Sequence, residues 1–150
     1  MTEIWSSQTF DFAMTIRAKA KERVSFSGKH AYKREKTREF EESLGYLFRA
    51  NYKNIPLKGP IFISVGVHLA RPKKSKYQYP RRGDVDNFVK SVFDAANKIV
   101  WEDDCQVVCQ TAYKAFGHKD SIVIDVREVG EVRKFLFFFR SAIVRFLRLY

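Results

Sequence analysis

Apolar residues recur along the chain in patterns that predict two strands with a helix between them. FDFAMTI, from Phe10 to Ile16, partly alternates apolar and polar residues, as a short half-buried strand does. IFISVGVHLA, from Ile61 to Ala70, alternates well enough for a strand of the core. From Tyr32 to about Tyr52 the apolar spacing is helical, through Phe40, Leu44, Leu47 and Phe48. The segment PLKGP, residues 56–60, separates this helix from the second strand.

A second helix is predicted from Val85 to about Ile99, with Asp84 as the residue whose side chain caps its first turn. On a helical wheel, its apolar side comprises Val89, Val92, Phe93, Ala96, Ile99 and Val100. Its polar side comprises Asp86, Lys90, Asp94 and Asn97. Cys105 and Cys109 then fall on one face of a further strand, where we expect two small buried thiols rather than a disulfide.

The C-terminal stretch GEVRKFLFFFRSAIVRFLRLY, residues 130–150, predicts a basic amphipathic helix. Its basic side comprises Arg133, Lys134, Arg140, Arg145 and Arg148. Its apolar side comprises Phe135, Phe139, Ala142, Ile143, Phe146 and Leu147. The helix is too short and too charged to span a bilayer, which leaves packing on the domain or a dimer mate, resting on a membrane surface, or covering DNA. We expect packing, because a globular domain routinely buries one such face.

Composition indicates a single domain and a negatively charged binding partner. With 150 residues, 45% of them apolar, the chain fits one globular domain, residues 1–150, with 130–150 as a helical extension. Lys and Arg total 28 against 17 Asp and Glu, a formal net charge of +11, which attracts phosphate-rich partners or anionic membranes.

Two basic loops are predicted, at residues 17–36 and 71–82. The second, RPKKSKYQYPRR, combines cations with Tyr77 and Tyr79, which favours nucleic-acid binding; a solvated loop with incidental tyrosines is the alternative. Its candidate DNA-binding residues are Lys73, Lys74, Lys76, Arg81 and Arg82.

Carboxylates nevertheless gather in the middle of this basic chain, as DVD at the start of the second helix and EDD, residues 102–104, after its end. A fold that returned the second group beside the first would build a metal site, since Mg²⁺ prefers carboxylate and water oxygens. Such a site suits phosphodiester cleavage, with Lys90 orienting water or stabilising charge on the phosphate. Pairing of Asp86, Lys90 and Asp94 at intervals of four along the helix is the structural alternative.

The stretch RRGDVDNFVKSVFDAANKIVWEDDCQVV, residues 81–108, resembles the signature of the RusA-type Holliday junction resolvases. It has the basic run, Asp-x-Asp-Asn, a lysine, Asp-Ala, and a Trp before Asp-Asp-x-Gln-Val, and the likeness extends to about residue 115. A lone Asp-x-Asp means little, whereas this combination at this spacing is specific. The resemblance implies that Asp84, Asp86 and Asp104 bind a metal and that Lys90 supports catalysis.

The resemblance also implies a fold and a substrate. It implies a small α+β domain, with a mixed β-sheet packed against two helices, acting as a homodimer with two active sites. It implies dependence on Mg²⁺ or Mn²⁺ and paired nicks in a four-way DNA junction, in a bacterial, prophage or phage setting. The first half of the chain matches only in outline, and the C-terminal helix is not part of the family pattern. A non-catalytic basic DNA-binding module and a general branched-DNA nuclease remain as alternatives.

Other chemistry has little support in the sequence. His30, His68 and His118 lack ligand spacing, and no glycine-rich phosphate loop precedes a helix, so we expect neither a histidine metal site nor a small-molecule cofactor. The N-terminus MTEIWSSQTFDF has no secretory pattern, which favours the cytoplasm, and no membrane partner is expected. Trp101 could stack on a base, but a tryptophan just after an apolar helix is expected to belong to the core.

Overall fold

The computed structural model describes the backbone of residues 5–14, 25–27, 30–32 and 35–147, and the side chains of residues 38–137, 139 and 140. The strands are β1 (Trp5–Met14), β2 (Ser25–Ser27), β3 (His30–Tyr32), β4 (Ile61–Ala70), β5 (Val107–Gly117) and β6 (Ser121–Val129). The helices are α1 (Glu35–Asn51), α2 (Val85–Ala96) and α3 (Val132–Leu147), and a single 3₁₀ turn, η1, spans Asp104–Gln106. Strands and helices are interspersed along the chain.

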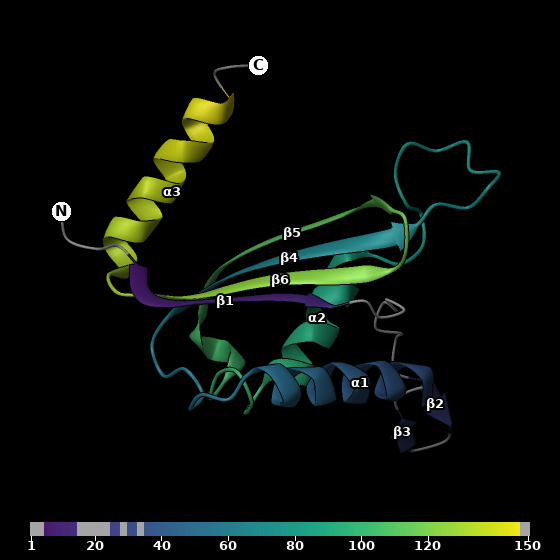
Figure 1. Ribbon diagram of the computed structural model, residues 1–150, viewed down its shortest axis with the longest axis horizontal. Coiled ribbons are helices and arrows are strands. Elements are labelled where there is room, and N and C mark those ends of the chain that lie inside the picture. The colour runs from purple at the N-terminus through teal and green to yellow at the C-terminus, as the bar shows by residue number, and fades with distance from the viewer. Residues whose placement is uncertain (1–4, 15–24, 28–29, 33–34, 148–150) are drawn as a thin grey trace.

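The main sheet has four strands in the order β1-β6-β4-β5. β4 pairs with β5 in parallel, while β6 pairs antiparallel with both β1 and β4, so the sheet is mixed and the α+β prediction is confirmed. Parallel neighbours need a crossover connection, and here it contains α2. Figure 1 shows α1 and α2 below one face of the sheet, with the loop 71–82 extending beyond the end of β4. This crossover carries every residue of the predicted metal site.

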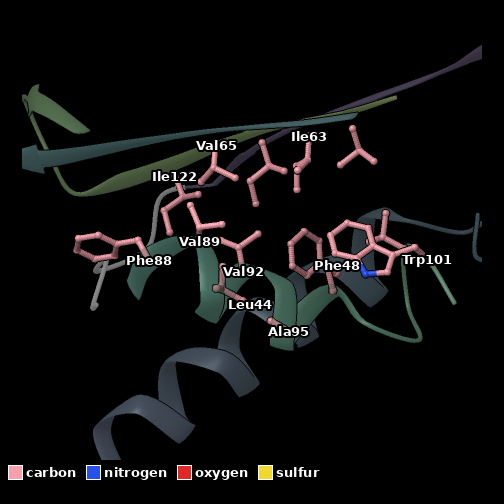
Figure 2. Packing of buried hydrophobic residues seen from close by; sticks show 14 of the residues in the cluster. Leu44, Phe48, Ile63, Val65, Phe88, Val89, Val92, Ala95, Trp101 and Ile122 are labelled. Carbon is pink, nitrogen blue, oxygen red and sulfur yellow. The ribbon is translucent and has the colours of Figure 1, made fainter. Parts of the chain in front are cut away.

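The core lies between the sheet and these two helices. Figure 2 shows Ile63 and Val65 of β4 directed toward Val89 and Val92 of α2, with Leu44 and Phe48 of α1 beyond them. Trp101 is fully buried at the end of this cluster, which confirms its assignment to the core. The buried side of α2 is rotated from the prediction, because Phe88 and Ala95 are buried whereas Phe93 is only half-buried.

Several element boundaries differ from those predicted. The second helix ends at Ala96 rather than Ile99, because Asn97 leaves helical geometry and Lys98 adopts a left-handed φ of 65°. The first helix begins at Glu35, and Tyr32 belongs instead to β3. The short antiparallel pair β2–β3 lies within the segment predicted to be a loop, so that part of the prediction is wrong. The first strand begins at Trp5, whereas its predicted end, residues 15–16, lies outside the described residues.

The two cysteines do not share the environment predicted for them. Cys105 lies in η1 and is exposed, so its placement in a strand as a buried thiol is wrong. Cys109 does lie in β5, where it is half-buried, and burial raises the pKa of its thiol. Both thiols are free, as expected.

α3 packs on the sheet through its first turns. Phe135 is fully buried, with its ring centroid 5.6 Å from that of Phe62 on β4, and the ring of Phe139 lies 6.0 Å from Phe62. Arg133, Lys134 and Arg140 are exposed, consistent with the predicted basic side. The side chains from Ser141 onward lie outside the described residues. Within the described part of the chain, no helix has the length and apolar character required to cross a membrane.

Candidate active site

Asp84 occupies the N-cap position of α2, but its side chain does not cap the helix. Its main-chain carbonyl accepts hydrogen bonds from the amides of Asn87 and Phe88, at 3.2 and 3.3 Å. Its carboxylate accepts no capping hydrogen bond, so the predicted side-chain role is wrong although the position is right. Helix capping therefore does not account for the carboxylate of Asp84. This carboxylate is exposed at the N-terminus of α2, the positive end of the helix dipole.

Lys114 fixes the backbone just before Asp84. Its ammonium, which projects from β5, donates a hydrogen bond to the carbonyl of Gly83, a residue 31 positions earlier in the chain. Gly83 has a φ of 68°, a conformation that favours glycine. No local pattern indicates the role of Lys114, because it is one of 28 basic residues and only the fold brings it to Gly83. The link positions Asp84 relative to the sheet.

Asp86 and Lys90 lie one turn apart on the exposed side of α2. The Nζ atom of Lys90 is 3.5 Å from Oδ2 of Asp86, and both side chains are more than 60% exposed. The pairing at an interval of four, which the sequence left as the structural alternative, is therefore present for these two residues. An exposed pair of this kind is worth only about 0.3–0.5 kcal/mol, so it leaves the carboxylate able to exchange the lysine for another cation.

The two aspartates of EDD have different structural positions. Asp103 caps η1: its carboxylate accepts a hydrogen bond from the amide of Cys105 at 2.9 Å, and its own amide donates to Oε1 of Gln106 at 2.8 Å. The hydrogen bonds from Cys105 lower the pKa of Asp103. Asp104 begins the turn and is exposed. Folding thus uses the first carboxylate of the pair and leaves the second at the surface.

Gln106 anchors this turn to the segment that leads into β4. Its Nε2 atom donates to the carbonyls of Leu57 and Gly59, each at 2.9 Å. Because its Oε1 atom also accepts from Asp103, the side chain of Gln106 makes three hydrogen bonds to main-chain atoms. In the sequence Gln106 stands out only as part of the motif, because its positioning role depends on contacts with residues more than 40 positions earlier in the chain.

A single chain keeps the two carboxylate groups apart. Asp84 and Asp104 flank opposite ends of α2, whose 12 residues span about 18 Å at 1.5 Å per residue. Among the residues whose side chains are described, no three His, Cys, Asp or Glu side chains are grouped so that they could hold a metal ion. Asp104 instead borders a hollow of about 470 Å³ between α2 and the start of β5, which is also lined by Phe93, Val107 and Cys109.

The predicted DNA-binding residues are all exposed on the loop 71–82, which leads directly into Asp84. Arg82 pairs with Asp120 at 2.5 Å, and the same carboxylate accepts a hydrogen bond from the amide of Ala70 at 2.8 Å. Arg81 donates to the hydroxyl of Tyr77 at 2.6 Å. The remaining members of the set are Lys73, Lys74 and Lys76. Figure 1 shows this loop at the end of the sheet from which α2 begins, and Arg81 and Arg82 precede Asp84 by only three and two residues.

Comparisons with known proteins agree with the motif. The model of the family described as Endodeoxyribonuclease RusA matches residues 13–127, which is more than half of the chain. The chain is also similar to the protein YqaN of Bacillus subtilis (strain 168), with 28% identity over 108 residues that cover 63% of this chain and 76% of YqaN. The residues matched by the family model, 13–127, include the candidate carboxylates, Lys90, Lys114 and the whole β4–α2–β5 crossover. The protein belongs to the RusA family of endodeoxyribonucleases.

Proposed function

We propose that this protein is a metal-dependent, structure-selective endodeoxyribonuclease that resolves four-way DNA junctions by paired cutting. The observation that carries the proposal is the Asp-x-Asp pair at the head of α2, in a member of this family, with its carboxylates exposed and not used for capping. The basic loop beside the pair supplies charges of the sign that attracts the DNA backbone. Family members act on Holliday junctions, and the substrate class proposed for this chain follows from that membership.

The proposed metal ligands are Asp84, Asp86 and Asp104, and the ion is Mg²⁺ or Mn²⁺. Carboxylate oxygens are the donors that these hard cations prefer, and all three side chains are exposed, whereas Asp103 is occupied in the η1 cap. A bound ion would activate water and offset negative charge on the scissile phosphate. Lys90, held beside Asp86, would place a positive charge close to that phosphate and stabilise it as the phosphorus–oxygen bond breaks.

A homodimer would bring the separated carboxylates together. If the α2 helices of two protomers lay antiparallel about a two-fold axis, Asp104 of one protomer would lie beside Asp84 and Asp86 of the other, and symmetry would build the second site in the same way. Two observations support this arrangement: the opposite locations of the two groups along α2, and the outer position of β5 in the sheet. Two symmetric sites also suit a substrate in which two equivalent strands must be cut.

The proposal is tested by cleavage of a synthetic four-way junction alongside a linear duplex of the same length. We expect two symmetric nicks in the junction with Mg²⁺ or Mn²⁺, slower cutting of the duplex, and no product in EDTA. Asp86→Asn protein, purified identically, controls for contaminating nucleases. Binding without cutting under every metal condition would favour a DNA-binding module, and equal cutting of both substrates would favour a general nuclease.

A further inference from the structure

A second concave feature lies at the far end of β4 and β5, under the loop 71–82. It is a cavity of about 470 Å³, which is within the range of roughly 300–1,000 Å³ found for small-ligand sites. Its floor is formed by Leu69 and Phe116, which are register partners in β4 and β5. Its walls come from the loop and include Tyr77 and Tyr79. The lining is thus largely apolar and aromatic, although the loop itself is rich in lysine and arginine.

Contacts within the loop hold the cavity open in a defined shape. Arg81 stacks over the ring of Tyr77, 4.7 Å from its centroid, and bonds to its hydroxyl. Arg71 donates to the carbonyl of Tyr77 at 3.3 Å, and its guanidinium lies 5.1 Å from the centroid of Phe116. The amide of Ser75 donates to the carbonyl of Pro72 at 3.0 Å. The walls are therefore pre-organised, which lowers the entropic cost of binding a ligand.

Tyr79 is the ring best placed to receive a ligand. It is 60% exposed although it lines the cavity, and its ring centroid lies 6.2 Å from that of Tyr77. Tyr77, by contrast, already has the Arg81 guanidinium over its ring. Tyr79 therefore presents an available flat surface, whereas Tyr77 serves as a fixed wall.

The charges around the cavity specify an anionic ligand. Lys74, Lys76, Arg81 and Arg82 all line it. Arg82 is paired with the carboxylate of Asp120, which also accepts a hydrogen bond from the amide of Ala70, so the net positive charge of the rim comes from Lys74, Lys76 and Arg81. An aromatic, apolar interior with a positively charged rim matches one chemical unit, a flat base attached to a phosphate.

We infer that this cavity binds a single unstacked nucleotide of a DNA strand, with its base against Tyr79 and its phosphates on the basic rim. A pocket of this size does not admit a stacked duplex, so the bound base must have left its stack, as bases do at flipped or single-stranded sites. The inference deepens the proposed function and rests on DNA being the substrate. Because the loop continues into Gly83 and Asp84, the captured nucleotide would belong to the strand that enters the candidate active site.

The test compares two single strands of equal length, one oligothymidylate and one made of abasic sugar-phosphate. Both carry the same phosphates, so a difference in affinity reports the bases alone. In fluorescence anisotropy in EDTA, the unsubstituted protein should show at least about a five-fold preference for oligothymidylate. Tyr79→Ala should abolish the preference while retaining affinity for the abasic strand, and Tyr79→Phe should keep it. Tyr46→Ala is the matched control, because Tyr46 is 72% exposed on α1, away from this loop.

Photo-crosslinking of the unsubstituted protein tests the same inference without depending on the folding of any variant. A single strand with one 5-iodouracil, irradiated in the complex, should crosslink to Tyr77, Tyr79 or Phe116, as located by mass spectrometry. Equal affinity for the two strands, or crosslinks confined to other segments, would overturn the inference. Neither assay requires metal or cutting. Junction cleavage without base preference would exclude nucleotide binding in this cavity and leave the nuclease proposal intact. Base preference without cleavage would support nucleotide binding and contradict the nuclease proposal.

Discussion

The ammonium of Lys114 donates a hydrogen bond to the carbonyl of Gly83 and thereby ties β5 to the residue that precedes Asp84. Gly83 has a left-handed φ, so the chain turns sharply just before α2 begins. The hydrogen bond from Lys114 holds this turn in place. The direction in which Asp84 leaves the sheet thus depends on a side chain 30 residues later in the sequence.

Lys114→Met should reduce junction cleavage by roughly ten- to a hundred-fold, because small displacements of a catalytic group are costly. Affinity for the junction in EDTA should change little, and the Mg²⁺ concentration that gives half-maximal cleavage should rise. Lys53→Met is the matched control, since Lys53 also donates to a main-chain carbonyl, that of Arg49, at 2.9 Å on an exposed helix end. A loss of affinity with an unchanged metal requirement would instead identify Lys114 as a phosphate contact.

Asp104→Asn should abolish cleavage, whereas Asp103→Asn should retain most of it. Asparagine caps a helical turn about as well as aspartate, so the second substitution preserves η1 while removing the same charge one residue away. Cleavage by both variants is measured under identical metal conditions, with junction binding in EDTA as the check on folding. Binding by Asp104→Asn should be intact or tighter, because less negative charge faces the phosphates. Comparable activity in the two variants would remove Asp104 from the site.

Lys90→Ala should lower the cleavage rate by about a hundred-fold, the scale seen when a charge-stabilising donor is removed. It should have a much smaller effect on affinity, because a role in the transition state affects turnover more than binding. Single-turnover rates and dissociation constants for the same junction give the two numbers. Equal losses in rate and affinity would assign Lys90 to ordinary phosphate binding.

Mixing the inactive variants Asp86→Asn and Asp104→Asn should restore nicking if each site draws residues from two protomers. One site of the mixed dimer would carry both substitutions, and the other would be unsubstituted. Such a dimer cuts one strand, so we expect cut strands on a denaturing gel and nicked junctions rather than resolved duplexes on a native gel. Subunit exchange is verified by native mass spectrometry. No recovery despite verified exchange would contradict the shared site.

Tyr52→Phe should lower the free energy of unfolding by about 1 kcal/mol at neutral pH, because the Tyr52 hydroxyl donates to the carbonyl of Ile55 at 2.9 Å. Burial, followed by the negative charge of Glu128, raises the pKa of Tyr52 above its ordinary value of 10.0. The contribution of the hydroxyl is therefore fully present below pH 10 and is lost as the pH rises through the folded-state pKa. Urea denaturation across this range should show the difference between Tyr52→Phe and the unsubstituted protein shrinking. At neutral pH, Tyr46→Phe, at a side chain that is 72% exposed, should leave the free energy of unfolding unchanged.

Sequence could predict elements with strong local patterns. The bounds of β4 follow from apolar alternation, the start of α2 from Asp84 as a residue suited to the N-cap position, and the burial of Trp101 from its place just after an apolar helix. These predictions are confirmed. The β2–β3 pair was missed, because strands of three residues carry too little alternation to be read. The end of α2 was placed too late, because apolar Ile99 and Val100 continue the pattern after Lys98 has broken the backbone geometry.

For the candidate site, sequence supplied the residue types and the structure supplied their positions. The motif identified Asp84, Asp86 and Asp104 as candidates, and spacing alone gave the Asp86–Lys90 pair. The links made by Lys114 and Gln106 join segments far apart in the chain, so no local pattern could predict them. The same holds for Phe116, whose place in the cavity under the loop depends on the parallel pairing of β4 and β5.

The carboxylate of Asp120 joins the two ends of the loop 71–82, since it accepts from the amide of Ala70 and pairs with Arg82. A loop closed at its base tolerates changes in length at small cost, because the entropy of closure rises only slowly with the number of residues. Residues can therefore be added to, removed from or exchanged within this segment while the stem, and the aspartates beyond it, stay in place. If this loop contributes to DNA binding as proposed, substrate preference could change without movement of the aspartates, and a loop from a relative could be grafted between Ala70 and Arg82 as a self-contained unit.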